Sequence, residues 1–142
     1  MMNLALLNPT LLCEAAPVGG RWIDAGRDGI AVTNPAGGEV IGHVPNLGAA
    51  ETLEAIDAAQ ILQKIWAART AKDRSNVLRR WFDLMMTNQA DLAKILTAEQ
   101  GKPLAEASGE VGYGAKVRGR DSMTSWKQST SVWVGLMQRV RS

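Results

Sequence analysis

Cysteine and histidine are almost missing from this sequence, whose 142 residues contain one of each, Cys13 and His43. A single cysteine cannot form a disulfide within the chain, which is typical of a reducing, cytoplasmic compartment. A structural zinc site needs four ligands, usually cysteine and histidine. We therefore predict neither a disulfide nor a metal site in this chain.

Long apolar runs and an early positive charge are also absent. No stretch approaches the ~20 apolar residues of a membrane span. No basic residue precedes Cys13, whereas a secretory signal begins with a positively charged region. The segment 10–13 is similar to a lipoprotein cleavage site, but Leu12 is larger than the residue such a site needs. We expect no membrane partner and a cytoplasmic location.

Charge is low overall but unevenly distributed. The net charge of +2 is too small to indicate a nucleic-acid partner by itself. Residues 1–115 carry ten basic and thirteen acidic side chains. Residues 116–142 carry one acid, Asp121, and six bases: Lys116, Arg118, Arg120, Lys127, Arg139 and Arg141. This asymmetry indicates that the last segment differs in role or origin from the rest.

The apolar content of 46% is ordinary for a globular domain of this length. Residues 1–48 are rich in Gly, Pro and Asn, and strand candidates lie between turn formers at 20–23, 30–33 and 40–44. They predict a small antiparallel hairpin or meander, which is marginal alone and needs something to pack against.

Residues 49–115 have the composition and periodicity of helices. The first helix, 49–68, is rich in Ala, Leu, Glu and Gln and has an apolar stripe weakened by Gln63. The second begins at Thr70 and Asp73, which have capping-box spacing. Its stripe, at i, i+3, i+4 and i+7, consists of Leu78, Trp81, Phe82 and Met85.

Asn88 is predicted to cap a third helix, which ends at Gly101, and Pro103 marks the start of a fourth. Glycines at 109, 112, 114 and 119 predict that helix breaks down beyond Glu110. The predicted fold class is α+β: a strand and turn segment over 1–48, three to four helices over 49–115, and a divergent basic tail over 116–142, expected to be disordered.

Few residues of this sequence are candidates for catalysis. Cys13 is a candidate nucleophile but has no neighbouring base in the sequence, and His43 lies in a predicted strand. Two carboxylate pairs lie at helical spacing, Glu51 with Glu54 and Glu106 with Glu110. Such pairs are usually a solvated helix face. We therefore assign no catalytic residue.

Two segments could bind phosphates, but neither has the full pattern. The glycine-rich segment 109–114 does not match G-x-G-x-x-G and follows a helical stretch rather than a strand. The stretch 69–80 holds five bases beside Trp66 and Trp81, but acids are interspersed in it. The basic tail is a second candidate for nucleic-acid binding, with Trp126 and Trp133 as stacking groups. We assign no cofactor-binding residue.

The order of several segments resembles the start of aldehyde dehydrogenases. They are Gly20-Arg21-Trp22, Val-Thr-Asn-Pro-Ala-Gly-Gly-Glu-Val-Ile-Gly at 32–42, and Glu-Ala-Ile-Asp-Ala-Ala at 54–59. Glu-Gln-Gly-Lys-Pro-Leu-Ala-Glu-Ala at 99–107 and Arg-Trp-Phe-Asp-Leu-Met-Met at 80–86 are similar to the succinate-semialdehyde dehydrogenase branch. The resemblance runs from about residue 4 to residue 115.

The resemblance implies an oxidoreductase of α/β fold with a Rossmann-like cofactor domain, which forms homo-oligomers. In such enzymes a cysteine thiolate attacks the aldehyde, hydride passes to NAD or NADP, and a glutamate activates the hydrolytic water. These residues lie beyond the point that this chain reaches, Pro-Trp-Asn-Phe-Pro is absent, and Cys13 does not match the nucleophile. We expect an N-terminal fragment that is inactive alone and binds no cofactor.

Alternatives remain open at this point. The chain could be a split subunit completed by another chain, or a module that binds nucleic acid through its basic tail. We also predict that the face of Trp81 and Met85 lacks part of its packing partner. From Lys116 the sequence departs from the family, and our hypothesis is a frameshift or rearrangement, tested by translating the surrounding DNA in its other frames.

Overall fold

The computed structural model describes residues 2–120, with side chains through residue 116. Its elements are a 3-10 helix η1 (Pro9–Leu11), the strands β1 (Ala15–Val18), β2 (Arg21–Asp24), β3 (Ile30–Thr33) and β4 (Val40–Val44), and the helices α1 (Ala49–Ala68), α2 (Ala71–Thr87), α3 (Gln89–Gln100) and α4 (Leu104–Arg120). The α+β class with antiparallel strands and four helices is confirmed.

The strands form two separate hairpins rather than one meander. β1 pairs antiparallel with β2, and β3 pairs antiparallel with β4. Gly19 and Gly20 join the first pair, and both have positive φ, 56° and 84°. A two-residue turn with positive φ at both positions matches the twist of a hairpin, which is why glycine is favoured there. β1 was not predicted from the sequence.

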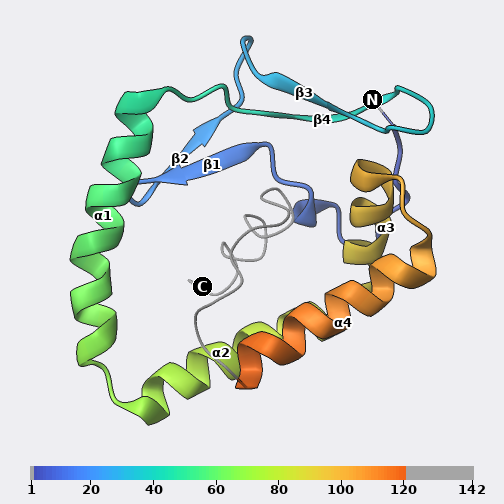
Figure 1. The fold of residues 1–142 in the computed structure, drawn as a ribbon. Coiled ribbons are helices and arrows are strands. Elements are labelled where there is room, and N and C mark those ends of the chain that lie inside the picture. The colour runs from blue at the N-terminus through green and yellow to red at the C-terminus, as the bar shows by residue number, and fades with distance from the viewer. Residues whose placement is uncertain (1, 121–142) are drawn as a thin grey trace.

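The helices and hairpins are arranged as an open frame (Figure 1). α1 forms one side, the hairpins the adjacent side, α3 the side opposite α1, and α2 with α4 the remaining side. Only Arg69 and Thr70 separate α1 from α2, so the chain turns a sharp corner there. Thr70 caps α2 as predicted, since its hydroxyl accepts the backbone N–H of Asp73 at 3.1 Å.

The core lies between α2, α3 and α4 and takes in η1. Its buried members are Leu11, Met85, Leu92, Ala93, Ile95, Leu96, Ala107, Val111 and Ala115. Trp81 and Phe82 pack against it half-buried, and Met85 is only 1% exposed. The prediction that the Trp81 and Met85 face lacks a partner is therefore wrong for Met85, because α4 and α3 cover that face.

α4 continues through the glycines that were predicted to break it and reaches Arg120. Ala107, Val111 and Ala115 lie four residues apart and are all buried against the core. Their packing offsets the roughly 1 kcal/mol that each glycine costs in a helix. Residues 116–120 are thus helical, whereas the rest of the predicted basic tail, 121–142, lies outside the described residues.

The C-terminal end of α3 is as the sequence predicts, whereas its N-terminal end is not. Gly101 follows the helix with φ +70°, as a glycine at this position was predicted to do. Asn88 precedes the helix, but its side chain makes no cap bond to α3. It donates instead to the carbonyl of Leu84 at 2.8 Å, so it serves the end of α2.

Candidate functional site

Cys13 and His43 line one pocket between the segment 12–14 and β4, together with Glu14 and Glu99. The Cys13 thiol donates to the carbonyl of Ala15 at 3.8 Å. Nδ1 of His43 lies 3.5 Å from a Glu14 carboxylate oxygen, which also accepts the His43 backbone N–H at 2.6 Å. Nucleophilic catalysis would need the Cys13 thiol beside the His43 imidazole. The thiol instead bonds the Ala15 carbonyl, and the imidazole faces Glu14.

The carboxylate pairs are used by the helices that carry them. Glu51 accepts the backbone N–H of Gly48 at 3.0 Å and so stabilises the start of α1. Glu54 pairs with Arg21 at 2.7 Å, and this ion pair joins α1 to the first hairpin. Glu110 accepts from Lys102 at 2.6 Å. Glu106, in the first turn of α4, is exposed. No pair converges on a common pocket in the described residues.

The glycine-rich segment 109–114 lies within α4, where backbone amides belong to helical hydrogen bonds. A phosphate cradle needs free amides at a turn or helix N-terminus. This segment therefore does not fit a nicotinamide cofactor. Within residues 2–120, no group of three His, Cys, Asp or Glu residues could hold a metal ion, and no helix could cross a bilayer.

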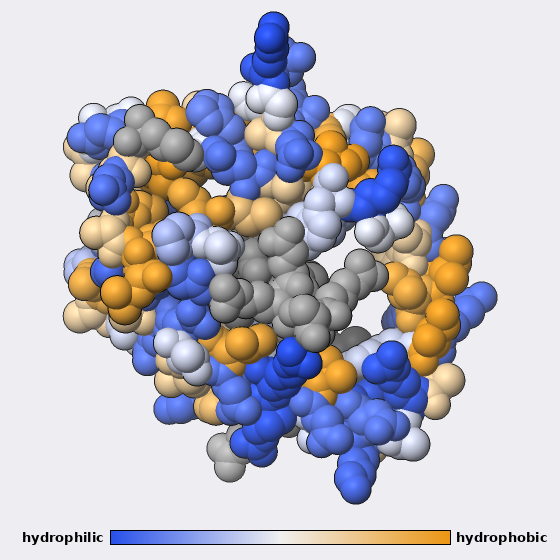
Figure 2. Space-filling model, turned by 180° about the vertical axis from the view of Figure 1, so that it is seen from behind, coloured by the Kyte–Doolittle hydropathy of each residue, from blue (hydrophilic) through white to orange (hydrophobic). Residues whose placement is uncertain are grey.

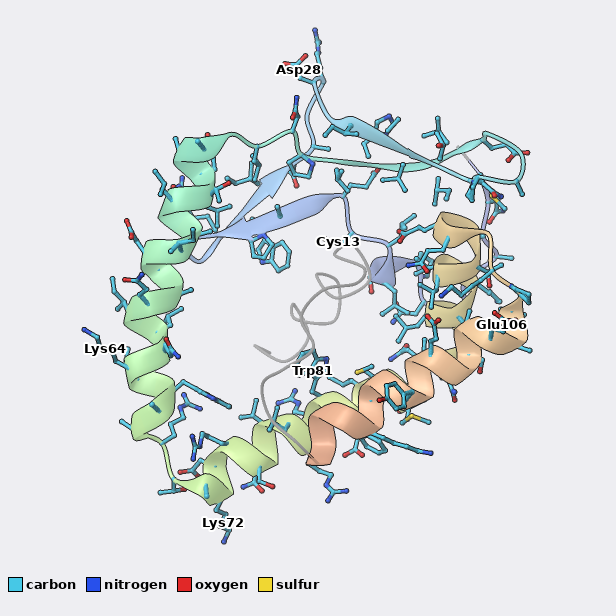
Figure 3. All side chains as sticks on the ribbon, viewed as in Figure 1. Cys13, Asp28, Lys64, Lys72, Trp81 and Glu106 are labelled. Carbon is cyan, nitrogen blue, oxygen red and sulfur yellow. The ribbon has the colours of Figure 1, made fainter. Side chains whose placement is uncertain are left out.

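The basic stretch 69–80, at the α1–α2 corner, is largely exposed, and its side chains contact neighbouring residues. The guanidinium of Arg69 lies over the Trp66 ring, 5.8 Å from its centroid. The hydroxyl of Thr70 donates to the Asp73 carboxylate at 2.6 Å. Lys72 points away from the frame (Figure 3). The predicted stacking groups Trp126 and Trp133 lie outside the described residues, and so does most of the basic tail.

A buried carboxylate on α3 is the main polar site that sequence reasoning missed. Asp91 is 3% exposed and accepts the backbone N–H of Asn8 at 2.8 Å. Lys94 lies 3.4 Å from Asp91 and donates to the carbonyl of Ala5 at 2.8 Å. Together these residues fix the N-terminal segment against α3. The sequence signal that could have indicated this site is the position of Asp91 directly before the apolar residues 92–93.

The pKa of Asp91 reflects this arrangement. Burial alone raises the pKa of the carboxyl, because it disfavours the charged form. Backbone hydrogen bonds from Asn8 and Leu7 and the ammonium of Lys94 favour the charged form more strongly. The net effect lowers the pKa of Asp91 below its ordinary value, so the carboxylate is ionised in the folded protein.

α1 is unusual among the helices in that none of its side chains is buried. Leu53, Ile56, Ile61, Leu62 and Ile65 are between 47% and 65% exposed. Apolar atoms run along this helix, at the right of the view in Figure 2. Contiguous exposed apolar patches are typical of interaction surfaces.

Comparison with known proteins identifies the fold. Residues 22–120 match the model of the aldehyde dehydrogenase family. The chain belongs to this family. It is 55% identical over 113 residues to the glutarate-semialdehyde dehydrogenase of Pseudomonas aeruginosa, and 50% identical over 113 residues to the NADP+-dependent succinate-semialdehyde dehydrogenase of Escherichia coli. Each alignment covers 79% of this chain and 23% of the relative.

Solved structures agree with these relatives. The crystal structure of an aldehyde dehydrogenase from Brucella melitensis biovar abortus superposes with a TM-score of 0.77 at 53% identity, covering 84% of this chain and 24% of that one. The chain therefore spans about a quarter of the length of the proteins that it matches. The predicted family and its semialdehyde branch are confirmed.

Proposed function

We propose that this chain is a structural segment of an NAD(P)-dependent semialdehyde dehydrogenase acting on succinic or glutaric semialdehyde, and that it does not catalyse the reaction alone. The observation that carries the proposal is that the chain has a buried helical core but spans about a quarter of the relatives' length. The named substrates of the relatives are ω-semialdehydes with a carboxylate at the other end.

Local contacts support the inactivity of the isolated chain. Aldehyde oxidation needs a thiolate nucleophile, a base and donors for the oxyanion, which contribute about 3 kcal/mol each. The Cys13 thiol is hydrogen-bonded to a backbone carbonyl, and His43 faces Glu14. The glycine-rich segment 109–114 lies inside α4, where its amides belong to helical hydrogen bonds rather than to a turn that could hold a pyrophosphate.

Within the completed fold, the residues of this chain would hold other segments in place. Asp91 and Lys94 fix the N-terminal segment to the helical core, and the Arg21–Glu54 pair joins the first hairpin to α1. This frame presents one long helix whose apolar side chains are available for packing. Its role in the enzyme is therefore to support the catalytic parts rather than to contact substrate.

An activity assay tests the proposal. The purified chain is mixed with succinic or glutaric semialdehyde and either NAD or NADP, and NAD(P)H absorbance is followed. We expect no NAD(P)H above the rate without protein, whereas the Escherichia coli relative gives a steady signal under the same conditions. NAD(P)H formation by the pure chain would overturn the proposal.

The split-subunit alternative rests on the same observation, because a segment with an intact core can be supplied by a separate polypeptide. It predicts activity only when a chain carrying the remaining fold is added. The predicted cytoplasmic location and homo-oligomeric state stay predictions for the completed enzyme.

A further inference from the structure

Residues 2–12 form an extended segment that is held in place by side chains of another element. Apart from η1, the segment contains no helix or strand, and it runs alongside α3 (Figure 1). A main chain that is shielded from water without such pairing must find hydrogen-bond partners elsewhere. α3 supplies several of them, so the segment is bound in the way that a peptide ligand is bound.

Two charged side chains of α3 contact the main chain of this segment. The buried carboxylate of Asp91 accepts the backbone N–H of Asn8 at 2.8 Å and also that of Leu7. The ammonium of Lys94 donates to the carbonyl of Ala5 at 2.8 Å. These contacts are made with peptide groups rather than with side chains. Main-chain hydrogen bonds of this kind give affinity in sites for extended peptides, and pockets for alternate side chains give specificity.

The side chains of the segment alternate between the core and solvent. Leu4 and Leu6 pack against the helical core, whereas Leu7 is 89% exposed. Farther along, Leu11 is 1% exposed and is part of the core itself. Extended chains have this period of two, so one side of the segment faces the protein. We name the surface that receives these leucines, with the two charged side chains of α3, the α3 site.

The backbone of the segment is strained at the point where Lys94 binds it. The φ of Ala5 is +46°, in the left-handed region that residues with a Cβ rarely adopt. Strained residues persist where surrounding contacts enforce them, and they concentrate at ligand clamps and switch regions. Release of the segment would relieve this strain, and the strain therefore favours release.

The chain carries both the α3 site and a segment that fits it, so two copies are complementary to each other. Residues 2–12 contain no charged side chain, and copies therefore do not repel one another through this segment. We propose that the α3 site is a peptide-binding site and that it takes the same segment from a second copy of this chain. In the exchanged pair, each segment makes on the other copy the contacts that it makes here on its own.

A fluorescent peptide with the sequence of residues 2–12 and a lysine tag for solubility tests the site on the full-length chain. In the wild type the chain's own segment competes at an effective concentration on the order of millimolar, so the peptide should bind weakly. L11A vacates the place of Leu11 in the core and should bind the peptide at least about tenfold more tightly, as measured by fluorescence anisotropy. If L11A does not fold, N8P, which removes the N–H that Asp91 accepts, serves in the same comparison.

Variants of the peptide distinguish the α3 site from general apolar adhesion. L11A in the peptide removes the buried anchor and should weaken binding at least about tenfold. L7A is the matched control, because Leu7 is 89% exposed, and should bind as the unchanged peptide does. N8P in the peptide tests the main-chain contact with Asp91 and should also weaken binding. Equal affinities for the L11A and L7A peptides would overturn the inference, and so would equal peptide binding by the weakened chain and the wild type.

Cross-linking tests the exchange between copies. The side chain of Asn8 donates to that of Asn88 at 3.3 Å, so these two positions mark a segment seated in the α3 site. Copies carrying N8C and copies carrying N88C, each with C13S, are mixed at high concentration and treated with a short bismaleimide. We expect a covalent dimer with one copy of each kind. K64C in place of N88C is the control, because Lys64 points away from the frame (Figure 3), and should give far less dimer. A mixture that stays monomeric, or one that cross-links equally with K64C, would exclude the exchange.

Discussion

At the scale of single residues, Asp91 is the most consequential side chain of the described fold. It is buried, ionised, and bonded to the backbone of the N-terminal segment. Replacing the Asp91 carboxylate leaves the part-buried N–H of Asn8 without a charged acceptor. The segment that contributes Leu11 to the core depends on this anchor.

We predict that D91N lowers the free energy of unfolding near neutral pH by roughly 1–3 kcal/mol. A carboxyl whose pKa is lowered by folding stabilises the protein above its unfolded pKa of ~3.9, and this stabilisation is lost as pH falls through the folded pKa. Urea unfolding at several pH values measures the effect. The wild-type and D91N curves should converge at acid pH, and a gap that persists there would contradict the assignment.

Gly101 and Gly109 give a matched pair of predictions. At Gly101 φ is +70° and an added Cβ would lie 2.9 Å from Cγ of Pro35, so G101A should destabilise by about 1–2 kcal/mol. At Gly109, inside α4, nothing lies within 4 Å of an added Cβ, so G109A should stabilise by roughly 0.5–1 kcal/mol. Thermal unfolding of both variants measures the contrast, and shifts of the same sign would refute it.

At the scale of elements, the sequence predicted three of the four strands and all four helices, and the exceptions have physical causes. β1 was missed because Gly20 was assigned to a strand, whereas Gly19 and Gly20 together form the turn of a hairpin. Residues on both sides of such a turn must pair. Recognising the Gly-Gly turn would have predicted the strand at 15–18.

The composition of α4 explains why its length was underestimated from the sequence. Glycine and alanine are small, so the stripe of Ala107, Val111 and Ala115 is hardly visible as a hydrophobic pattern. Small residues allow close approach of helices, and Nε2 of Gln89 on α3 donates to the Ser108 carbonyl of α4 at 2.9 Å. Tertiary packing therefore overrides the local propensity. The exposed face of α1 was equally unpredictable, because burial depends on the neighbours that surround a helix.

Helix packing gives a direct comparison between α2 and α1. M85A removes a side chain that is 1% exposed and should cost about 2–5 kcal/mol of stability, whereas L62A removes one that is 56% exposed and should cost less than about 0.5 kcal/mol. Chemical denaturation measures both. Equal losses would mean that α1 is packed in the isolated chain.

The α1–α2 corner carries a second element-scale prediction. The Thr70 hydroxyl accepts from Asp73 N–H at 3.1 Å and donates to its carboxylate at 2.6 Å. T70A should therefore lower the unfolding free energy by about 1 kcal/mol. T70S keeps the hydroxyl and should restore most of the loss, so a T70S variant as unstable as T70A would exclude the cap as the cause.

At the scale of the whole molecule, the described fold consists of a buried core among α2, α3 and α4 and an exposed helix, α1. Amide protection against hydrogen exchange follows buried apolar contacts. We predict that amides of α3 and of the C-terminal half of α2 exchange slowest in the isolated chain, and that α1 exchanges much faster. Mass spectrometry of exchange over time checks this order. Strong protection of α1 in a monomer would contradict the exposure described here.

The position of the core along the sequence has a consequence for the order of folding. All but one of the buried residues of the helical core lie between Met85 and Ala115, so most of its contacts close short loops. Proteins rich in such local contacts fold fast. During synthesis the helical core would therefore condense within moments of its last residue leaving the ribosome. α1, made earlier, would keep its apolar side chains exposed after this core has formed.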